Sequence, residues 1–334
     1  MRKKMIAFLL ILPLVLPVLC NTAAAKPFYE GKIIKLIVST RPGGGYDFYG
    51  RMMAQYMRKY LPGSTIIVKN IPGAGHIIGT NDIYHAKPDG LTFGAFSSAL
   101  PLAQVAEMKG VKFDLTKMSL LGSAGENIQT FFVSTKSPFK SVEDIIKADR
   151  VRMACGGAGS LNYACALLFA QMKGLSNIKI IAGYHGGEDL LAMMRGEIEA
   201  EFHSWGTVEP FVKDGHGIPI MFIGDKHVPG YENVPLLSEV VTEKQHMAGV
   251  GLLRSVCVVG RPFAGPPGIP KDRLEILRNA FKKACHDPEA IKMANKAGQP
   301  ITFMDHEAMM KDYNSMLNIP PETREAVKKA YGSQ

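Results

Sequence analysis

A glycine-rich loop at residues 42–45 has the sequence context of an anion-binding site. It follows a β-branched apolar run at residues 33–38 and precedes residues 46–60, where apolar side chains recur at helical spacing. A loop between a strand and a helix presents unpaired backbone N–H groups at the positive end of the helix dipole, and glycine lets an anion approach them closely. A simple tight turn between a strand and a helix would show the same sequence pattern. The candidate binding residues of this loop are Gly43, Gly44 and Gly45.

A second glycine-rich loop, residues 155–160, has the same context between a strand-like run at residues 151–154 and a helical pattern at residues 161–173. Its last residue, Ser160, can cap the helix or bond to a ligand oxygen. Because the two loops occupy equivalent positions in two halves of the chain, we expect each to bind one end of a carboxylate. The candidates here are Gly157, Gly159 and Ser160.

A third glycine loop, residues 73–75, together with Gly79 faintly resembles a dinucleotide-binding fingerprint. Pro72 directly precedes it, however, and no acidic residue ends a following strand at the expected place. No Lys-Ser or Lys-Thr pair follows a glycine loop, as a Walker motif requires. We therefore predict no nucleotide cofactor and count Gly75 and Ser97 as further ligand-facing residues.

Patterns of catalytic and metal sites are missing from the sequence. There is no G-x-S-x-G motif, and the nine histidines are scattered. No C-x-x-C or H-E-x-x-H spacing indicates zinc. An enzyme, a metal centre and a cofactor are therefore not expected. Six histidines are interpreted as surface or turn residues: His76, His85, His227, His246, His286 and His306.

Strands and helices alternate in two cycles that position these loops. The first cycle has strand-like runs at residues 33–38, 65–69 and 91–96 with helical patterns at residues 46–60 and 77–86. The second has strand-like runs at residues 131–133, 151–154, 179–182 and 200–203 with helical patterns at residues 141–147, 161–173 and 188–195. This alternation predicts an α/β fold with helices on the faces of a sheet.

The last part of the chain is expected to return to the first cycle. Residues 251–259 are a long apolar segment that is expected to run back to the first cycle, and several prolines then precede helices at residues 271–285 and from Pro288. This order predicts two lobes joined by two crossing strands, with the ligand in the cleft between them. The expected lobes are residues 26–126 with 253–334, and residues 127–252.

The first 25 residues have the order of a secretory signal peptide. Three cations at residues 2–4 precede an apolar run that is interrupted by prolines and shorter than the roughly 20 residues of a membrane-spanning helix. Small residues predict cleavage after Ala25 and a periplasmic protein. A membrane anchor and lipidation of Cys20 are the alternatives, and Leu19 disfavours lipidation.

Composition excludes other classes of protein. About 309 residues after the signal peptide suggest two domains, and 46% apolar with 21% charged residues is ordinary for a globular protein. The net charge of +9 is spread along the chain, without the basic clusters of nucleic-acid-binding proteins. Export permits disulfides, but the spacing favours buried free thiols at Cys155, Cys165, Cys257 and Cys285.

Five stretches, taken together, resemble the extracytoplasmic solute receptors of tripartite tricarboxylate transporters, also called Bug-type receptors. They are residues 33–38, 42–47, 68–75, 87–92 and 228–235. Their order and spacing match the family over nearly the whole chain after residue 25. The resemblance implies a type II periplasmic-binding-protein fold that closes around a carboxylate, and a monomer that docks on a permease of one large and one small subunit.

The resemblance also implies roles for individual residues. In the family the two glycine loops hold carboxylate oxygens, partly through backbone amides and waters. Those roles correspond here to Gly43, Gly44, Gly45 and Asp47, and to Gly157, Gly159 and Ser160. A further binding loop of the family corresponds to Tyr184, Gly186 and Gly187.

The sequence departs from the family pattern at positions that are expected to contact the ligand. Arg41 replaces an apolar residue, His185 replaces a common lysine, and His203 stands where aspartate is frequent. Since an amino acid needs a carboxylate to pair with its ammonium group, we expect a dicarboxylate or aromatic acid instead. Trp205 either packs inside its lobe or forms an aromatic wall of the pocket.

Two other function classes share these features. A sensor subunit that presents its ligand to a signalling partner would have the same fold. An exported α/β enzyme would turn its ligand over, whereas a receptor only binds it.

Overall fold

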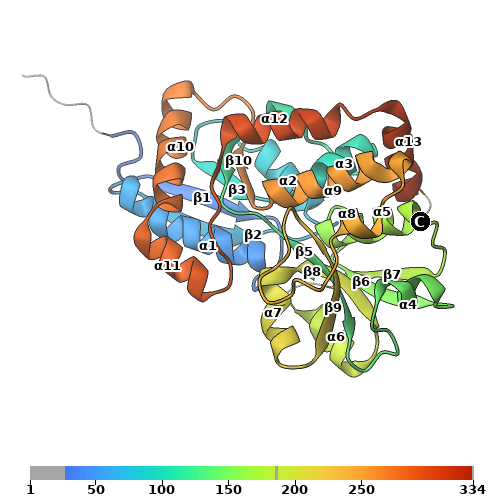
Figure 1. Ribbon diagram of the computed structural model, residues 1–334. Helices are drawn as coiled ribbons and strands as arrows, with labels where there is room; N and C mark the ends of the chain where they lie inside the picture. The colour runs from blue at the N-terminus through green and yellow to red at the C-terminus, as the bar shows by residue number, and fades with distance from the viewer. Residues whose placement is uncertain (1–26, 185–186, 333–334) are drawn as a thin grey trace, which may run out of the picture.

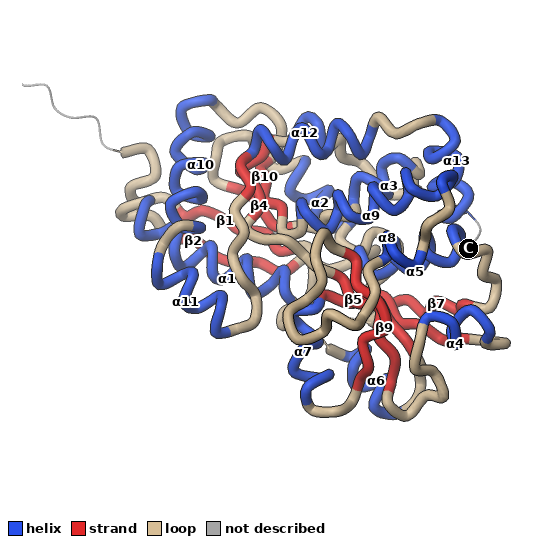
Figure 2. Tube along the Cα trace, in the orientation of Figure 1, coloured by secondary structure: helices blue, strands red, loops and turns tan. Residues whose placement is uncertain are grey.

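The computed structural model describes residues 27–184 and 187–332, which form two lobes, each built around one β-sheet (Figure 1). Figure 2 shows the strands gathered in two groups with helices around them. The α/β class and the two-lobed periplasmic-binding-protein fold are confirmed. The predicted signal peptide lies outside the described residues, as do His185 and Gly186.

The sheet of the first lobe has six strands in the order β11-β4-β10-β3-β1-β2. β1 pairs in parallel with β2 and β3, whereas β10 runs antiparallel to β3 and β4. The strands are β1 (Ile33–Val38), β2 (Thr65–Asn70), β3 (Thr92–Ala95), β4 (Ser119–Ser123), β10 (Pro262–Gly265) and β11 (Met304–Asp305).

The sheet of the second lobe has five strands in the order β7-β6-β8-β5-β9. β6 pairs in parallel with β7 and β8, and β5 runs antiparallel to β8 and β9. The strands are β5 (Gln129–Ser134), β6 (Val151–Cys155), β7 (Ile178–Ala182), β8 (Ala200–Ser204) and β9 (Gly217–Ile223).

Helices cover both sheets. α1 and α10 pack on the first lobe's strands and α5 and α7 on the second lobe's strands. Among the described residues, no helix is long and apolar enough to cross a membrane. The helices are α1 (Gly45–Met57), α2 (Ile77–Tyr84), α3 (Leu100–Val105), α4 (Val142–Lys147), α5 (Leu161–Met172), α6 (Glu188–Arg195), α7 (Trp205–Lys213), α8 (Leu237–Val240), α9 (Met247–Val259), α10 (Lys271–Cys285), α11 (Pro288–Lys296), α12 (His306–Leu317) and α13 (Pro321–Gly332).

The expected crossing strand at residues 251–259 is wrong, because this run is the second half of helix α9. Its buried positions recur every three to four residues, while Gly251 and Arg254 are exposed between them, and this spacing fits a helix and not a strand. The predicted lobe boundary at residues 252/253 falls inside this helix. The lobes are instead joined by residues 124–128, between β4 and β5, and by Gly260 and Arg261, between α9 and β10.

The two connecting segments lie side by side. Ala124 N–H donates to Arg261 O (3.0 Å), and Asn127 N–H donates to Cys257 O (2.8 Å). Gly260 has a φ of 48°, and a Cβ there would lie 2.2 Å from Gly125 O. The close approach of the two segments therefore requires glycine at position 260.

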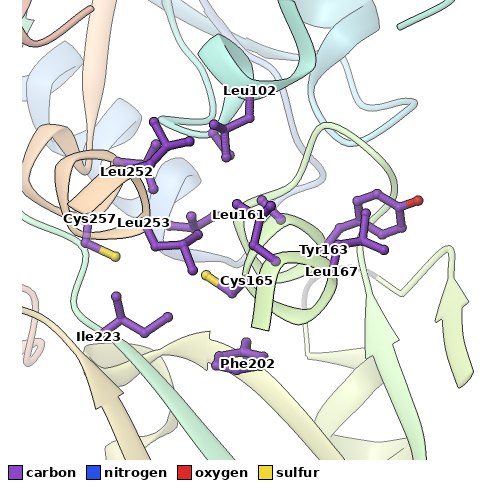
Figure 3. Close-up of a cluster of buried hydrophobic side chains, with 14 of the residues drawn as sticks. Leu102, Leu161, Tyr163, Cys165, Leu167, Phe202, Ile223, Leu252, Leu253 and Cys257 are labelled. Carbon is purple, nitrogen blue, oxygen red and sulfur yellow. The ribbon is translucent and has the colours of Figure 1, made fainter. Parts of the chain in front are cut away.

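One hydrophobic cluster continues from lobe to lobe. It includes Leu102 of α3, Cys165 of α5, Leu253 of α9 and Tyr313 of α12. Figure 3 shows side chains of α5 and α9 converging above Phe202 of β8. The lobes therefore share an apolar core in addition to the connecting segments.

The described cysteines are buried and free, which confirms the interpretation of Cys155, Cys165, Cys257 and Cys285 as buried thiols. Burial raises the pKa of the Cys155 and Cys257 thiols to about 12. Because the thiolate is the reactive form, these residues should be inert in the folded protein.

We predict that the native protein, produced from residue 27 onward, shows no thiol that reacts with a disulfide reagent within minutes. The same protein unfolded in guanidinium should show all of its thiols, which makes it the control. Rapid reaction of even one thiol in the native protein would contradict the burial described here.

Candidate functional site

A polar cavity of about 120 Å³ lies between the lobes, beside the residues that follow β1, β6 and β8. Both lobes and the connecting segments contribute to it. Its lining consists of Thr40, Gly44, Gly45, Tyr46 and His76 from the first lobe, Asn127 and Arg261 from the connecting segments, and Gln129, Gly156, Ser160, Leu161, Asn162, Tyr184, Asp189, His203, Ser204 and Thr207 from the second lobe.

The amino-terminal end of α1 opens into this cavity. Its N-cap residue, Gly44, has extended backbone, and no side chain caps the first turn. A Cβ on Gly44 would meet no atom within 4 Å, so the space in front of the loop is open. Backbone N–H groups and the positive end of a helix dipole in this position favour an anion.

Asp47 supports the loop and does not line the cavity. Its carboxylate accepts hydrogen bonds from Gly43 N (3.0 Å), Asn70 Nδ2 (2.8 Å) and Arg51 Nε (2.9 Å). Burial acts to raise the pKa of Asp47, but these hydrogen bonds hold it below its usual value. The ionised carboxylate therefore fixes the conformation of the glycine loop.

Arg261 brings a buried positive charge to the cavity. The residue is 2% exposed. Its Nη2 donates to Ser204 Oγ (2.7 Å), and its guanidinium lies 4.7 Å from the ring centroid of Tyr46 and 5.3 Å from that of Tyr49. No carboxylate in the described part of the chain forms an ion pair with Arg261, and its Nε has no hydrogen-bond partner there. Such a charge is costly to bury unless an anion joins it.

Gly45 makes room for this guanidinium. A Cβ on Gly45 would lie 2.7 Å from Arg261 Nη2. The guanidinium and the positive end of α1 therefore lie together. Their combined field attracts anions into the cavity.

The amino-terminal end of α5 faces the cavity from the second lobe. Ser160 occupies the N-cap position, but its hydroxyl donates to Gly157 O (2.5 Å) and does not cap the helix. The N-cap side chain therefore leaves the first turn of α5 uncapped, as in α1, although Tyr163 N donates to Asn162 Oδ1 (3.0 Å). Two helix amino termini and one guanidinium give most of the cavity a positive character.

Gly75, Gly157 and Gly159 form a backbone contact between the lobes and do not line the cavity. A Cβ on Gly159 would lie 2.2 Å from Gly75 O, and a Cβ on Gly75 would lie 2.5 Å from Gly159 N. An exposed ion pair between Arg41 and Glu188 (3.1 Å) also joins the lobes. These predicted binding residues therefore hold the lobes together.

Asp189 and His203 line the cavity, with Glu201 fully buried beside them. His203 Nε2 lies 3.5 Å from Asp189 Oδ2, and Asn162 Nδ2 donates to Glu201 Oε1 (3.1 Å). Burial and the charge of Asp189 raise the pKa of Glu201 well above its usual value. Burial also acts to raise the pKa of Asp189, but His203 lowers it to about 2. Asp189 therefore carries the negative charge and Glu201 keeps its proton.

The same three residues have the spacing of metal ligands, since one ligand atom of each lies within 4.8 Å of the others. No sequence motif indicated this group. A metal ion would have to displace the proton of Glu201. We interpret the group as an ionised carboxylate, Asp189, beside a protonated carboxyl, Glu201, and an imidazole, His203.

The remaining predicted residues lie in different surroundings. The predicted residues that line the cavity are Gly44, Gly45, Ser160, Tyr184 and His203. Ser97 is buried, and its Oγ accepts from Ala99 N (3.2 Å). Gly187 is the N-cap of α6 with a φ of 91°. Trp205 packs on Phe222 and Tyr231, with ring centroids 5.1 and 4.7 Å away, and is not among the residues that line this cavity.

The sequence did not reveal several lining residues. His76, interpreted as a surface or turn residue, is buried, and its Nδ1 is hydrogen-bonded to Ser39 Oγ (2.7 Å). Arg261 had one usable signal, because it is a lone cation between apolar residues. Asp189 looked like an ordinary acid in the first turn of a helix. Its presence removes the reason for excluding an amino-acid ligand.

The comparisons with known proteins agree with this architecture. The family model described as "Tripartite tricarboxylate transporter family receptor" matches residues 50–318. A UPF0065 protein of Bordetella bronchiseptica is 26% identical over 315 residues, which cover 91% of this chain and 89% of that protein.

Two solved structures show the same fold. The periplasmic binding protein BugD has a TM-score of 0.76 at 19% identity, covering 90% of this chain and 98% of BugD. MatC of Rhodopseudomonas palustris, solved with bound malate, has a TM-score of 0.73 at 18% identity, covering 89% of this chain and 99% of MatC.

We predict that the wild type loses stability as the pH rises and that the Glu201→Gln variant does not. The folded-state pKa of Glu201 is raised, so above its ordinary value of 4.5 unfolding releases a proton. The free energy of unfolding then falls by up to about 1.4 kcal/mol per pH unit until the raised pKa is passed. The pKa of Asp189 is lowered to about 2 from 3.8, so its contribution is lost only in acid.

Urea unfolding of both proteins between pH 5 and pH 8 measures this difference. Glutamine keeps the acceptor for Asn162, and the variant should be the more stable protein at pH 7. Glu325→Gln, an exposed position on α13, is the control and should follow the wild type. Parallel profiles for the wild type and Glu201→Gln would show that Glu201 is ionised in the folded protein.

We also predict that Gly159→Ala separates the lobes without unfolding either one. All three atoms nearest to the new Cβ belong to the first lobe: Gly75 O, Ile77 Cγ1 and Ala74 O. Small-angle scattering should show a larger radius of gyration, while the free energy of unfolding changes by less than about 1 kcal/mol.

Gly251→Ala on α9 is the matched control, because a Cβ there meets no atom within 4 Å. Its scattering should equal that of the wild type. If Gly159→Ala has the same radius of gyration as the wild type, the glycine contact does not hold the lobes together.

Proposed function

Because this chain belongs to the tripartite tricarboxylate transporter receptor family, we propose that it is an exported receptor that binds a small organic carboxylate and delivers it to a tripartite tricarboxylate-type membrane transporter. The observation that carries this proposal is Arg261, a buried cation that lines the cavity between the lobes. A carboxylate in the cavity would neutralise the guanidinium and accept hydrogen bonds from it.

The geometry around Arg261 supports an anionic group of carboxylate size. The uncapped first turns of α1 and α5 offer backbone N–H groups to the same cavity. Gly44 leaves the approach to α1 open. The small volume, about 120 Å³, suits a small acid.

Delivery to a transporter rests on family membership, and malate in the structure of MatC supports an organic acid as cargo. The transporter partner would be a permease of one large and one small subunit. Residues 1–25 would direct export to the periplasm, and the receptor would act as a monomer without a catalytic step.

The proposal predicts that at least one acid from a broad panel raises the melting temperature of the protein. A ligand at 100 times its dissociation constant stabilises the folded state by about 2.7 kcal/mol. The panel should contain acids that share a carbon skeleton and differ only at carbon 2, such as propionate, lactate and alanine, or succinate, malate and aspartate. It should also include glutarate with its 2-hydroxy and 2-amino forms, citrate, adipate and benzoate.

Arg261→Met should then weaken the tightest-binding acid at least thirtyfold, about 2 kcal/mol, because the charged partner of the carboxylate is gone. Stability without ligand should not fall, since the variant also removes an unpaired buried charge. Arg254→Gln is the control. Arg254 lies on the exposed face of α9 and forms an ion pair with Asp225 (2.5 Å). Unchanged affinity in Arg261→Met, or no response to any acid, would refute the proposed function.

A further inference from the structure

Asp189 places a negative charge in a cavity whose other buried charge is the cation of Arg261. We infer that the ligand is a small carboxylic acid that also carries a hydrogen-bond donor, a hydroxyl or an ammonium group. Asp189 accepts from this donor. The inference rests on the proposed function and specifies the class of acid.

The hydrogen-bonding capacity of Asp189 is only partly used. The residue is 4% exposed and lines the cavity. Its Oδ1 accepts from Leu190 N (2.8 Å). Its Oδ2 lies 3.5 Å from His203 Nε2, beyond ordinary hydrogen-bond length. The protonated carboxyl of Glu201 takes a further position. An ionised carboxylate has about four acceptor positions, so Asp189 keeps one for a donor in the cavity.

Two side chains of the second lobe, Glu201 and His203, contact Asp189. Glu201 is fully buried and is held in its protonated form by burial and by the charge of Asp189. Both ring nitrogens of His203 face oxygen atoms, Nδ1 toward Ser204 O (3.4 Å) and Nε2 toward Asp189. Asp189 is thus the acceptor that this side of the cavity offers to a ligand.

The cation and the acceptor line the same small cavity, of about 120 Å³. Arg261 Nη2 bonds to Ser204 Oγ (2.7 Å), and Ser204 directly follows His203, the neighbour of Asp189. A small acid that fills this cavity can therefore meet both groups.

A second carboxylate fits this place poorly. It would meet the negative charge of Asp189 at short range in a buried site, where like charges repel strongly. A hydroxyl or ammonium group meets an acceptor there. An acid that also carries a hydroxyl or ammonium group can therefore meet both Arg261 and Asp189.

The matched acids of the panel test this directly, by calorimetry on protein treated with EDTA. For each skeleton that binds, the hydroxy or amino form should bind at least tenfold tighter than the unsubstituted acid. Equal or tighter binding of the unsubstituted acid would overturn the inference while leaving the proposed function intact. If no acid of the panel binds, both the inference and the proposed function are overturned. A requirement for added zinc or manganese would also overturn it, because a metal ion would then occupy Asp189, Glu201 and His203.

Asp189→Asn provides a second test. It should reduce the tenfold preference to less than about threefold, and it should bind the unsubstituted acid more tightly than the wild type does, because a repulsive charge is removed. An ammonium ligand should lose more affinity than a hydroxyl ligand, since an amide oxygen still accepts from a hydroxyl. Asp214→Asn, at the exposed end of α7, should keep the wild-type preference. A full tenfold preference in Asp189→Asn would show that Asp189 does not recognise the donor.

Discussion

The burial of one guanidinium without a carboxylate partner is the constraint on which the site depends. Arg261 stays in the interior because the rings of Tyr46 and Tyr49 and the hydroxyl of Ser204 surround it. Cation–π contacts and a single neutral hydrogen bond only partly replace the hydration that the charge has lost. Without a ligand, the charge of Arg261 is therefore only partly compensated. An anion that compensates it would gain binding free energy.

The glycines that first suggested an anion site have different roles in the structure. Gly44 leaves the approach to α1 open, Gly45 makes room for the guanidinium, and Gly75 with Gly159 lets two backbones touch between the lobes. In the sequence all of them look like ligand-binding glycine loops. Their roles differ because the atoms opposite each glycine come from distant parts of the chain, which local sequence cannot show.

Sequence patterns predicted the alternating strands and helices well where hydrophobic periodicity was strong, as in β1, α5 and α10. They failed at residues 251–259, where β-branched residues hide a helix whose packing on α5 and α12 decides its structure. The sequence did not predict the charged residues of the site, for a related reason. Asp189 and Arg261 are far apart in the chain, and neither belongs to a motif. Only the fold brings both to one cavity.

The position of Arg261 also links ligand recognition to the geometry of the lobes. Arg261 lies in one of the two connecting segments, and its side chain bonds to Ser204 of the second lobe. Asp189 and His203 belong to that lobe alone, whereas α1 belongs to the first. A ligand that contacts Arg261, α1 and Asp189 at once can do so only when the lobes are in contact. In the proposed function, the ligand would stabilise the arrangement in which the lobes touch, by contacts that it can make only there.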